Sequence, residues 1–319
     1  MVQSTMRVFL TGASGVIGRR VVPLLTAAGH VVTAIGRTAE KRAQLERMGA
    51  RVVEVSLFDT IALRDAVSGH DAVINLATHM PPSSLRMLLP GAWSENDRVR
   101  TVGSDHLVGA ALAGGVERFV QESFAPVYPD RGDEWIDETV TIEPMRFNRS
   151  IADAERSAAH FNLGARSGIV LRFSAFYGPD ARHLTDFVRS IRHGWAPMPG
   201  PSGAFISSIS HDDAATAVVA ALGLPAGTYN VTDDVPVTHR DYVESLAAAL
   251  GVDPPGLPPE WTTFLLGDIG RMLSRSLRIS NAKLRAASDW RPRYSSVHEG
   301  WRAIVDAGAW APTGVAFAR

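Results

Sequence analysis

The stretch VFLTGASGVIG at residues 8–18 determines which fold we expect. The apolar run Val8 to Leu10 is typical of a buried strand, and glycines follow it at positions 12, 15 and 18. At this spacing Gly12 allows a sharp turn, Gly15 leaves room for a phosphate beside the backbone, and Gly18 lets the next helix pack against the strand. The N–H groups and positive dipole end of that helix favour a pyrophosphate. A glycine run can also form a plain turn, but its place between a strand and a helix predicts a dinucleotide site.

Strands and helices alternate over the first half of the chain. After the first strand, apolar runs predict strands at residues 31–35, 51–55, 71–77, 118–123 and 168–173. Helical spacing predicts helices at 17–28, 37–48, 59–67, 95–113 and 144–161, the third of them capped by Asp59. This order predicts an α/β fold, a Rossmann-type doubly wound parallel sheet with helices on both faces.

The regular alternation ends after the sequence YGP at residues 177–179. Beyond it we expect strands at 204–210 and 227–231 and helices at 211–222, 239–250 and 280–287. We therefore expect residues 1–175 to form the dinucleotide-binding domain and residues 176–319 to form mainly a smaller C-terminal substrate-binding lobe. Segments near 204–235 are expected to return to the sheet.

Composition excludes several other classes of protein. The 319 residues carry a net charge of −1, so we expect no binding to nucleic acid or to an anionic membrane. The chain has no cysteine, which excludes disulfides, thiolate metal sites and a cysteine nucleophile, and no other metal-ligand spacing stands out. No signal peptide and no bilayer-spanning apolar run are recognisable. We expect a cytoplasmic monomer or homodimer whose partner is a small-molecule aromatic substrate.

The end of the second predicted strand indicates which dinucleotide is bound. A carboxylate at this place accepts hydrogen bonds from the ribose 2′-hydroxyl, whereas an arginine pairs with a 2′-phosphate. The sequence has Arg37 here and no acid before Glu40. Arg37 can be a solvated surface residue, but its position and charge favour NADPH, with NADH as the alternative. The other cofactor contacts are expected from the glycine loop and the ends of the third and fourth strands: Ser14, Val16, Ile17, Ser56, Leu57, Leu76, Ala77 and Thr78.

Further motifs extend over nearly the whole chain. They are TGASGVIG at 11–18, GGVERFV at 114–120, LRFSAFYGP at 171–179, ISHDD at 209–213, GTYNVTDD at 227–234 and SNAKLRAASDWRP at 280–292. This ordered set resembles the extended short-chain dehydrogenases/reductases, the group that includes NAD(P)-dependent sugar epimerases and dehydratases. The resemblance implies a catalytic serine or threonine, a tyrosine that transfers the proton, and a lysine that lowers the pKa of that tyrosine and holds the nicotinamide ribose.

None of these three catalytic residues is present at the matching position. The serine position is Phe124, the tyrosine position is Phe147 and the lysine position is Ile151. The chain has only two lysines, Lys41 and Lys283, and neither has a tyrosine four residues before it. The usual tyrosine–lysine pair is therefore absent in any alignment. Two further positions of the family pattern differ as well, since Arg100 replaces an asparagine and Ser56 replaces the acid that meets adenine.

Three residues are weak candidates for the missing proton donor. His79 follows the fourth strand, and an imidazole titrates near neutral pH, although a solvated histidine is the simpler interpretation. Ser174 follows the sixth predicted strand, where the family contacts nicotinamide, but a serine alone is a poor acid. Tyr128 occupies a position where the family has a packing tyrosine. Ser123 points to the opposite face from its neighbour Phe124 and is not expected to substitute.

A reaction without a protein acid is the alternative that we favour. A ketone that is hydrogen-bonded to a phenol of the same molecule brings its own proton, so the protein needs only to hold it beside the nicotinamide. An apolar wall suits such a ring system, although each of its members can equally be core: Trp93, Phe124, Met145, Phe147 and Ile151. The chain resembles tailoring reductases of actinomycete aromatic polyketides, which implies an NADPH-dependent ketoreductase of an angucyclinone-like ketone. An inactive NADP(H)-binding sensor or scaffold, and a non-redox isomerase or dehydratase, remain open.

Overall fold

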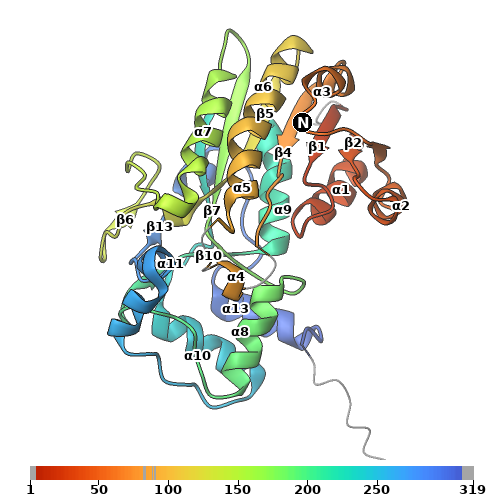
Figure 1. The fold of residues 1–319 in the computed structure, drawn as a ribbon. Coiled ribbons are helices and arrows are strands. Elements are labelled where there is room, and N and C mark those ends of the chain that lie inside the picture. The colour runs from red at the N-terminus through yellow and green to blue at the C-terminus, as the bar shows by residue number, and fades with distance from the viewer. Residues whose placement is uncertain (1–4, 82–83, 88, 90, 311–319) are drawn as a thin grey trace, which may run out of the picture.

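The computed structural model describes residues 5–81, 84–87, 89 and 91–310 of the protein. Its centre is a seven-stranded parallel sheet with the order β11–β7–β5–β4–β1–β2–β3 (Figure 1). These strands are β1 (Arg7–Thr11), β2 (Val31–Ile35), β3 (Arg51–Val53), β4 (Ala72–Asn75), β5 (Arg118–Phe124), β7 (Ser167–Phe173) and β11 (Gly227–Val231). The order reverses between β1 and β4, and ligands of open α/β sheets bind at the carboxyl ends of the strands at such a point. The predicted fold class is confirmed.

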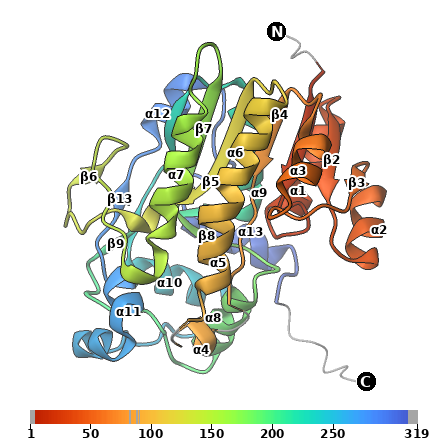
Figure 2. The same ribbon diagram turned by 45° about the horizontal axis from the view of Figure 1, so that its top comes forward.

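Helices cover both faces of the sheet. Figure 2 shows α3 (Thr60–Val67), α6 (Ser104–Ala113) and α7 (Ser150–His160) side by side on one face. The helices α1 (Gly18–Ala27) and α9 (His211–Ala220) pack together on the other. Successive residues of β1 enter the two cores in turn, because Val8 and Leu10 pack on the α1–α9 side and Phe9 packs on the α3–α6 side. All three side chains are fully buried, which explains the unbroken apolar run.

A smaller group of helices lies beyond the carboxyl ends of the strands (Figure 1). It contains α8 (Arg182–Arg192), α10 (His239–Leu250), α11 (Gly267–Leu273) and α13 (Val297–Asp306). Its core centres on the fully buried Trp301, whose ring centroid lies 5.1 Å from that of Tyr177 and 5.8 Å from that of Tyr242. Between these helices the chain returns to the large layer, since β11 pairs with β7 and α9 packs on α1. We propose the domain division near residue 175 on this basis.

The α10 helix shows why some boundaries are readable from sequence. Thr238 accepts a hydrogen bond from the Asp241 N–H at 3.1 Å, and the Asp241 carboxylate accepts one from the Thr238 N–H at 3.3 Å. Gly251 ends the helix in the left-handed conformation with φ of 68°. A capping box and a C-terminal glycine are local signals, so the predicted helix at 239–250 has the observed bounds.

Other boundaries differ from the prediction. The single strand predicted at 204–210 is two short strands, β9 (Phe205–Ile206) and β10 (Ser208–Ser210), which pair with β12 (Val237–Thr238) and β8 (Ala175–Tyr177) respectively. The helix predicted from residue 144 begins at Ser150, after one 3-10 turn at Arg146–Asn148. The helix predicted at 95–113 consists of α5 (Ser94–Arg98), a π-helical turn (Val99–Gly103) and α6.

The remaining elements are short. They are α2 (Ala39–Arg47), α4 (Ser84–Met87), α12 (Ala282–Ala287), β6 (Trp135–Ile136) and β13 (Arg278–Ile279), together with 3-10 turns. The sequence does not predict α4, α8, α11 or the pair β6–β13. Within the described ranges, no helix combines the length and the apolar character that a bilayer crossing requires.

Candidate active site

The glycine loop between β1 and α1 forms a cradle that only glycine can build. Gly12 has φ of +69°, and a Cβ there would lie 2.3 Å from the Leu76 carbonyl oxygen. A Cβ at Gly18 would lie 2.3 Å from the Gly12 carbonyl oxygen, whereas Gly15 is exposed. No side chain caps α1 at Ile17. In the described part of the chain no acceptor is found for the N–H groups of Ser14, Val16 and Ile17. Free donors at an uncapped helix start fit a pyrophosphate.

Two arginines near the expected ribose end of the cradle differ in whether they are already paired. Arg42 is paired, because its Nη1 lies 2.6 Å from the Glu54 Oε2. Arg37 is exposed and pairs with no group among the described residues. Ser56 is also exposed, and its hydroxyl accepts a hydrogen bond from the Phe58 N–H at 3.2 Å. Arg37 is therefore the arginine left free for a 2′-phosphate, and we propose it for that role together with the loop residues named above.

Replacing Arg37 with alanine should weaken NADPH binding by about 10- to 100-fold, because a charge-assisted hydrogen bond contributes about 1.5–3 kcal/mol. NADH binding should change little, since NADH has no 2′-phosphate. Fluorescence titration of both cofactors measures the two affinities. Arg47→Ala is the matched control, since Arg47 lies exposed at the end of α2, the helix that follows Arg37, and its Nε donates to the Ala43 carbonyl. Equal losses for NADPH and NADH in Arg37→Ala would contradict the assignment.

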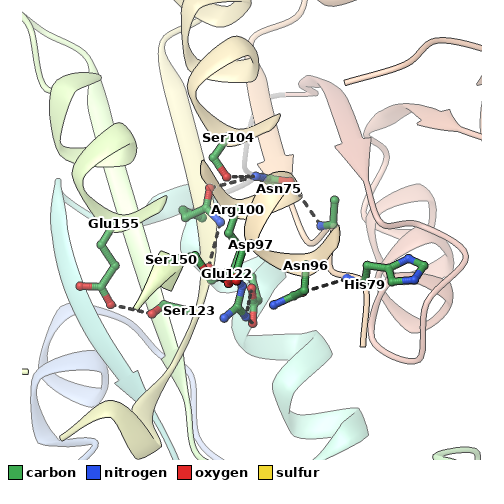
Figure 3. Close-up of polar contacts among 12 residues, drawn as sticks. Asn75, His79, Asn96, Asp97, Arg100, Ser104, Glu122, Ser123, Ser150 and Glu155 are labelled. Atoms are coloured by element: carbon green, nitrogen blue, oxygen red, sulfur yellow. Dashed lines mark hydrogen bonds and ion pairs between the residues drawn. The ribbon is translucent and has the colours of Figure 1, made fainter. Parts of the chain in front are cut away.

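A polar network fixes the carboxyl end of β4 (Figure 3). The Asn75 Oδ1 accepts a hydrogen bond from the Thr11 hydroxyl at 2.5 Å and one from the Ala77 N–H at 3.3 Å. The Asn75 amide donates to the Ser104 Oγ at 3.2 Å and to the Gln121 Oε1 at 2.9 Å. Because Asn75 links β1, α6 and β5, it fixes the backbone that carries the proposed cofactor contacts Leu76 and Ala77.

The chain becomes exposed directly after this point. Thr78 and His79 are both exposed, and the His79 N–H donates to the Asn96 Oδ1 at 2.9 Å. The His79 imidazole points away from the polar groups that gather between α5 and α7 (Figure 3). His79 therefore stays a weak candidate for a proton donor. Thr78 stays a proposed cofactor contact.

The three positions of the missing catalytic residues all hold apolar side chains. Phe124 ends β5 and is half-buried, Phe147 lies half-buried on the 3-10 turn before α7, and Ile151 in the first turn of α7 is 1% exposed. The ring of Phe147 packs against that of Trp93, with centroids 5.1 Å apart and planes at 49°. The half-buried Met145 is one residue before the same turn. The residues expected to form a wall thus include one pair in direct contact.

Two other candidates are buried. Ser174 is fully buried, and within the described residues its hydroxyl has no hydrogen-bond partner. Tyr128 is also fully buried, its hydroxyl donates to the Asn230 Oδ1 at 2.8 Å, and it accepts from the Arg172 Nη1 at 2.7 Å. Burial raises the pKa of Tyr128 to about 12. Tyr128 therefore stays a weak candidate for the proton donor, since its hydroxyl already belongs to a buried hydrogen-bond network.

A cluster of charged and polar side chains that the sequence analysis missed lies where α5, the π-helical turn, β5 and α7 meet (Figure 3). The Arg100 Nη2 on the π-helical turn bonds both carboxylate oxygens of Glu122, at 2.8 and 3.0 Å, and both side chains are largely buried. The Ser150 hydroxyl donates to the Asp97 Oδ1 at 2.6 Å. The only sequence signal was Arg100 itself, a charge in place of the asparagine of the family pattern. No group of three histidine, aspartate or glutamate side chains suited to a metal occurs among the described residues.

Comparison with known proteins agrees with this geometry. Residues 12–162 match a family model described as NAD(P)H-binding. The chain is 34% identical over 313 residues to a 3-diazoavenalumate denitrifying reductase of a Streptomyces species, covering 92% of this chain and 99% of that protein. It is 26% identical over 258 residues to a 4-hydroxy-2-methyl-3-oxo-4-farnesyl-3,4-dihydroquinoline-1-oxide ketoreductase of Stigmatella aurantiaca, covering 77% and 74%. The human epimerase family protein SDR39U1, solved with NADPH, superposes with a TM-score of 0.79 at 20% identity, over 94% of this chain and 99% of that one.

The parallel sheet and the glycine cradle define a Rossmann-type, NAD(P)H-binding protein. Within that class the chain belongs to the short-chain dehydrogenase/reductase family, and its fold is that of the epimerase-like structures. It is an NAD(P)H-dependent oxidoreductase of this family.

Proposed function

We propose that the protein is an NADPH-dependent ketoreductase that reduces a ketone of a large phenolic aromatic polyketide to an alcohol. The substrate would be angucyclinone-like, as for ketoreductases of the simocyclinone 7-ketoreductase type. The observation that carries the proposal is that Phe124, Phe147 and Ile151, all apolar, stand at the positions of the catalytic triad, with Phe147 packed against Trp93. A flat aromatic molecule packs favourably against aromatic side chains such as these, and a substrate with an internal proton source needs no tyrosine.

The bound cofactor supplies the hydride in this reaction. The hydride adds to the carbonyl carbon while the proton of the neighbouring phenol moves to the carbonyl oxygen, and water then returns a proton to the phenolate. Phe147 and its partner Trp93 hold the ring system flat, and the buried Ile151 excludes water from the lysine position. The relative named as a ketoreductase of a ring ketone supports this reaction type.

Loss of NADPH absorbance with a panel of ketones tests the proposal. We expect oxidation of NADPH with 8-hydroxy-1-tetralone and its polycyclic homologues, in which a phenol lies beside the ketone. The 8-methoxy analogues are the matched control, and they should react at least tenfold more slowly because they lack the internal proton. Tight NADPH binding without any oxidation would favour a sensor or scaffold, and product without net cofactor use would favour an isomerase or dehydratase.

Restoring the family dyad should bring little gain. In Phe147→Tyr, and in Phe147→Tyr with Ile151→Lys, we expect kcat/KM to change by less than about tenfold, because the substrate already supplies the proton. A positioned general acid typically contributes about 10²–10⁴-fold where one is needed. Steady-state kinetics with the hydroxyketone measures the effect. A gain in kcat/KM of about a hundredfold or more would show that the wild-type reaction is slow because no protein acid is present. Such a gain would contradict the substrate-assisted mechanism.

One relative favours a second candidate reaction, the reductive removal of a diazo group. This relative is 34% identical over nearly its whole length and is named as a denitrifying reductase of a diazo compound. Here the hydride adds to the terminal nitrogen of an arenediazonium ion to give an aryldiazene. The carbon–nitrogen bond then breaks, dinitrogen leaves, and the ring carbon takes the proton of the diazene. This reaction also needs no tyrosine. Measuring dinitrogen and the arene formed per NADPH oxidised distinguishes it from ketone reduction.

A further inference from the structure

Asn148 is a buried amide whose hydrogen bonds are largely unmade. It lies on the 3-10 turn directly after Phe147 and is 3% exposed. The partner of its Nδ2 is the sulfur of Met272, at 3.5 Å. Its Oδ1 is buried and has no hydrogen-bond partner among the described residues. A thioether is a weak acceptor, so a side chain able to accept two hydrogen bonds and donate two has almost none.

Such an arrangement is unfavourable unless a ligand completes it. A buried acceptor left without a donor loses its hydration without compensation, and native structures contain few such groups. Asn230 shows the ordinary arrangement in the same protein. Its Oδ1 accepts from the Tyr128 hydroxyl at 2.8 Å, and its Nδ2 donates to the Ser280 carbonyl at 3.3 Å. The contrast shows that Asn148 lacks partners that an equally buried asparagine of this chain has.

The location of Asn148 connects it with the substrate. Its turn leads into α7 beside the sheet, and its Met272 contact belongs to α11 of the smaller helical group. Ligand sites occur preferentially between such parts of a protein. The neighbouring Phe147 and Trp93 provide an aromatic surface at the same turn. A polar group within an apolar surround is what fixes the orientation of an aromatic ligand in a pocket.

We propose that Asn148 is a specificity-determining residue, whose Oδ1 accepts a hydrogen bond from a phenolic hydroxyl of the substrate away from the reacting carbonyl. The inference rests on the proposed function, because it names the feature by which a phenolic aromatic substrate is recognised. Met272 and Phe147 contact the ring system on either side of that hydroxyl. A substrate without the hydroxyl leaves Asn148 unpartnered, and sites built to bind a hydroxyl reject such analogues strongly.

Binding of two small probes to the NADP⁺-loaded protein tests this without turnover. The probes are 2-hydroxyanthraquinone and 2-methylanthraquinone, which differ by a hydroxyl against a methyl of similar size. Binding is measured at about pH 6, so that the hydroxyl keeps its proton. The wild type should bind the hydroxyl probe about 10- to 100-fold more tightly. In Asn148→Leu, which is nearly isosteric, this preference should disappear while NADPH affinity is unchanged.

Thermal unfolding of the ligand-free protein gives a second readout that a structural role would not produce. Removing an unpartnered buried amide should raise the Tm of Asn148→Leu by about 2–4 °C. The matched control Asn230→Leu removes an amide whose hydrogen bonds are made, so it should lower the Tm. A lower Tm in Asn148→Leu, an unchanged probe preference, or no binding of the hydroxyl probe to the wild type would each overturn the inference. Probe recognition that depends on Asn148 without hydride transfer to any ketone would uphold it while the proposed function fails.

Discussion

Gly12→Val should abolish NADPH binding, with a loss of at least about a hundredfold in affinity. The residue has φ of +69°, which β-branched side chains rarely adopt, and its Cβ would lie 2.3 Å from the Leu76 carbonyl oxygen. Relief of that contact must move either the glycine loop or the end of β4, and both border the proposed cofactor site. Cofactor fluorescence titration, with circular dichroism to confirm folding, measures the outcome.

Gly109→Val is the matched control for this prediction. Gly109 lies exposed in α6, and nothing lies within 4 Å of the place of its Cβ. Valine in a helix is at least as favourable as glycine, so stability and NADPH affinity should both stay near those of the wild type. A Gly12→Val protein that is folded and binds NADPH with nearly wild-type affinity would show that the cradle is not where the cofactor lies.

Arg172→Met should destabilise the protein by about 3–5 kcal/mol, which is the usual effect of leaving one member of a buried ion pair alone. Arg172 bonds both carboxylate oxygens of Glu155, at 2.8 and 2.6 Å, and the two side chains are 9% and 11% exposed. The same carboxylate accepts from the Ser123 hydroxyl at 2.6 Å, and Arg172 also donates to Tyr128. Denaturant unfolding measures the change.

The double variant Arg172→Met with Glu155→Leu separates the effect of the buried charge on stability from the effect of side-chain packing. With both charges removed, most of the lost stability should return, because no uncompensated charge stays buried. Arg156→Met is the surface control on the same helix as Glu155. Arg156 pairs with Asp153 but is 67% exposed, so its loss should change stability by at most about 1 kcal/mol. A double variant as unstable as Arg172→Met would mean that packing, not charge, accounts for the loss.

The parts of the fold that are readable from sequence are those determined by local signals. The run Val8 to Leu10 is apolar throughout because β1 is covered on both faces, and Asp59 caps α3 by accepting from the Ala62 N–H at 3.1 Å. The bounds of α8 could not be read in this way, because its apolar residues pack against α10 of the same helical group. The π-helical turn at Val99–Gly103 likewise interrupts a helix whose sequence shows no glycine or proline before Gly103.

For the candidate site, too, some features could be predicted from sequence and others could not. The apolar positions Phe124, Phe147 and Ile151 could be read from the family pattern, since each replaces a residue of known place. The pairing of Arg100 with Glu122, 22 residues apart, could not, because it depends on how the π-helical turn and β5 meet. The missing hydrogen bonds of Asn148 could not be predicted from sequence either, since a missing partner is recognised only when the positions of all neighbouring residues are known.

Hydride transfer to an aromatic ketone without a tyrosine–lysine pair is the step on which the proposed function depends. Its most direct test is a reaction of the wild type with 8-hydroxy-1-tetralone and NADPH carrying deuterium at the transferred C4 position, followed by mass spectrometry of the product. We expect one deuterium on the carbinol carbon for each NADPH oxidised, and none on the alcohol oxygen in ordinary water. Product without deuterium, or retained NADPH that no hydroxyketone oxidises, would contradict it.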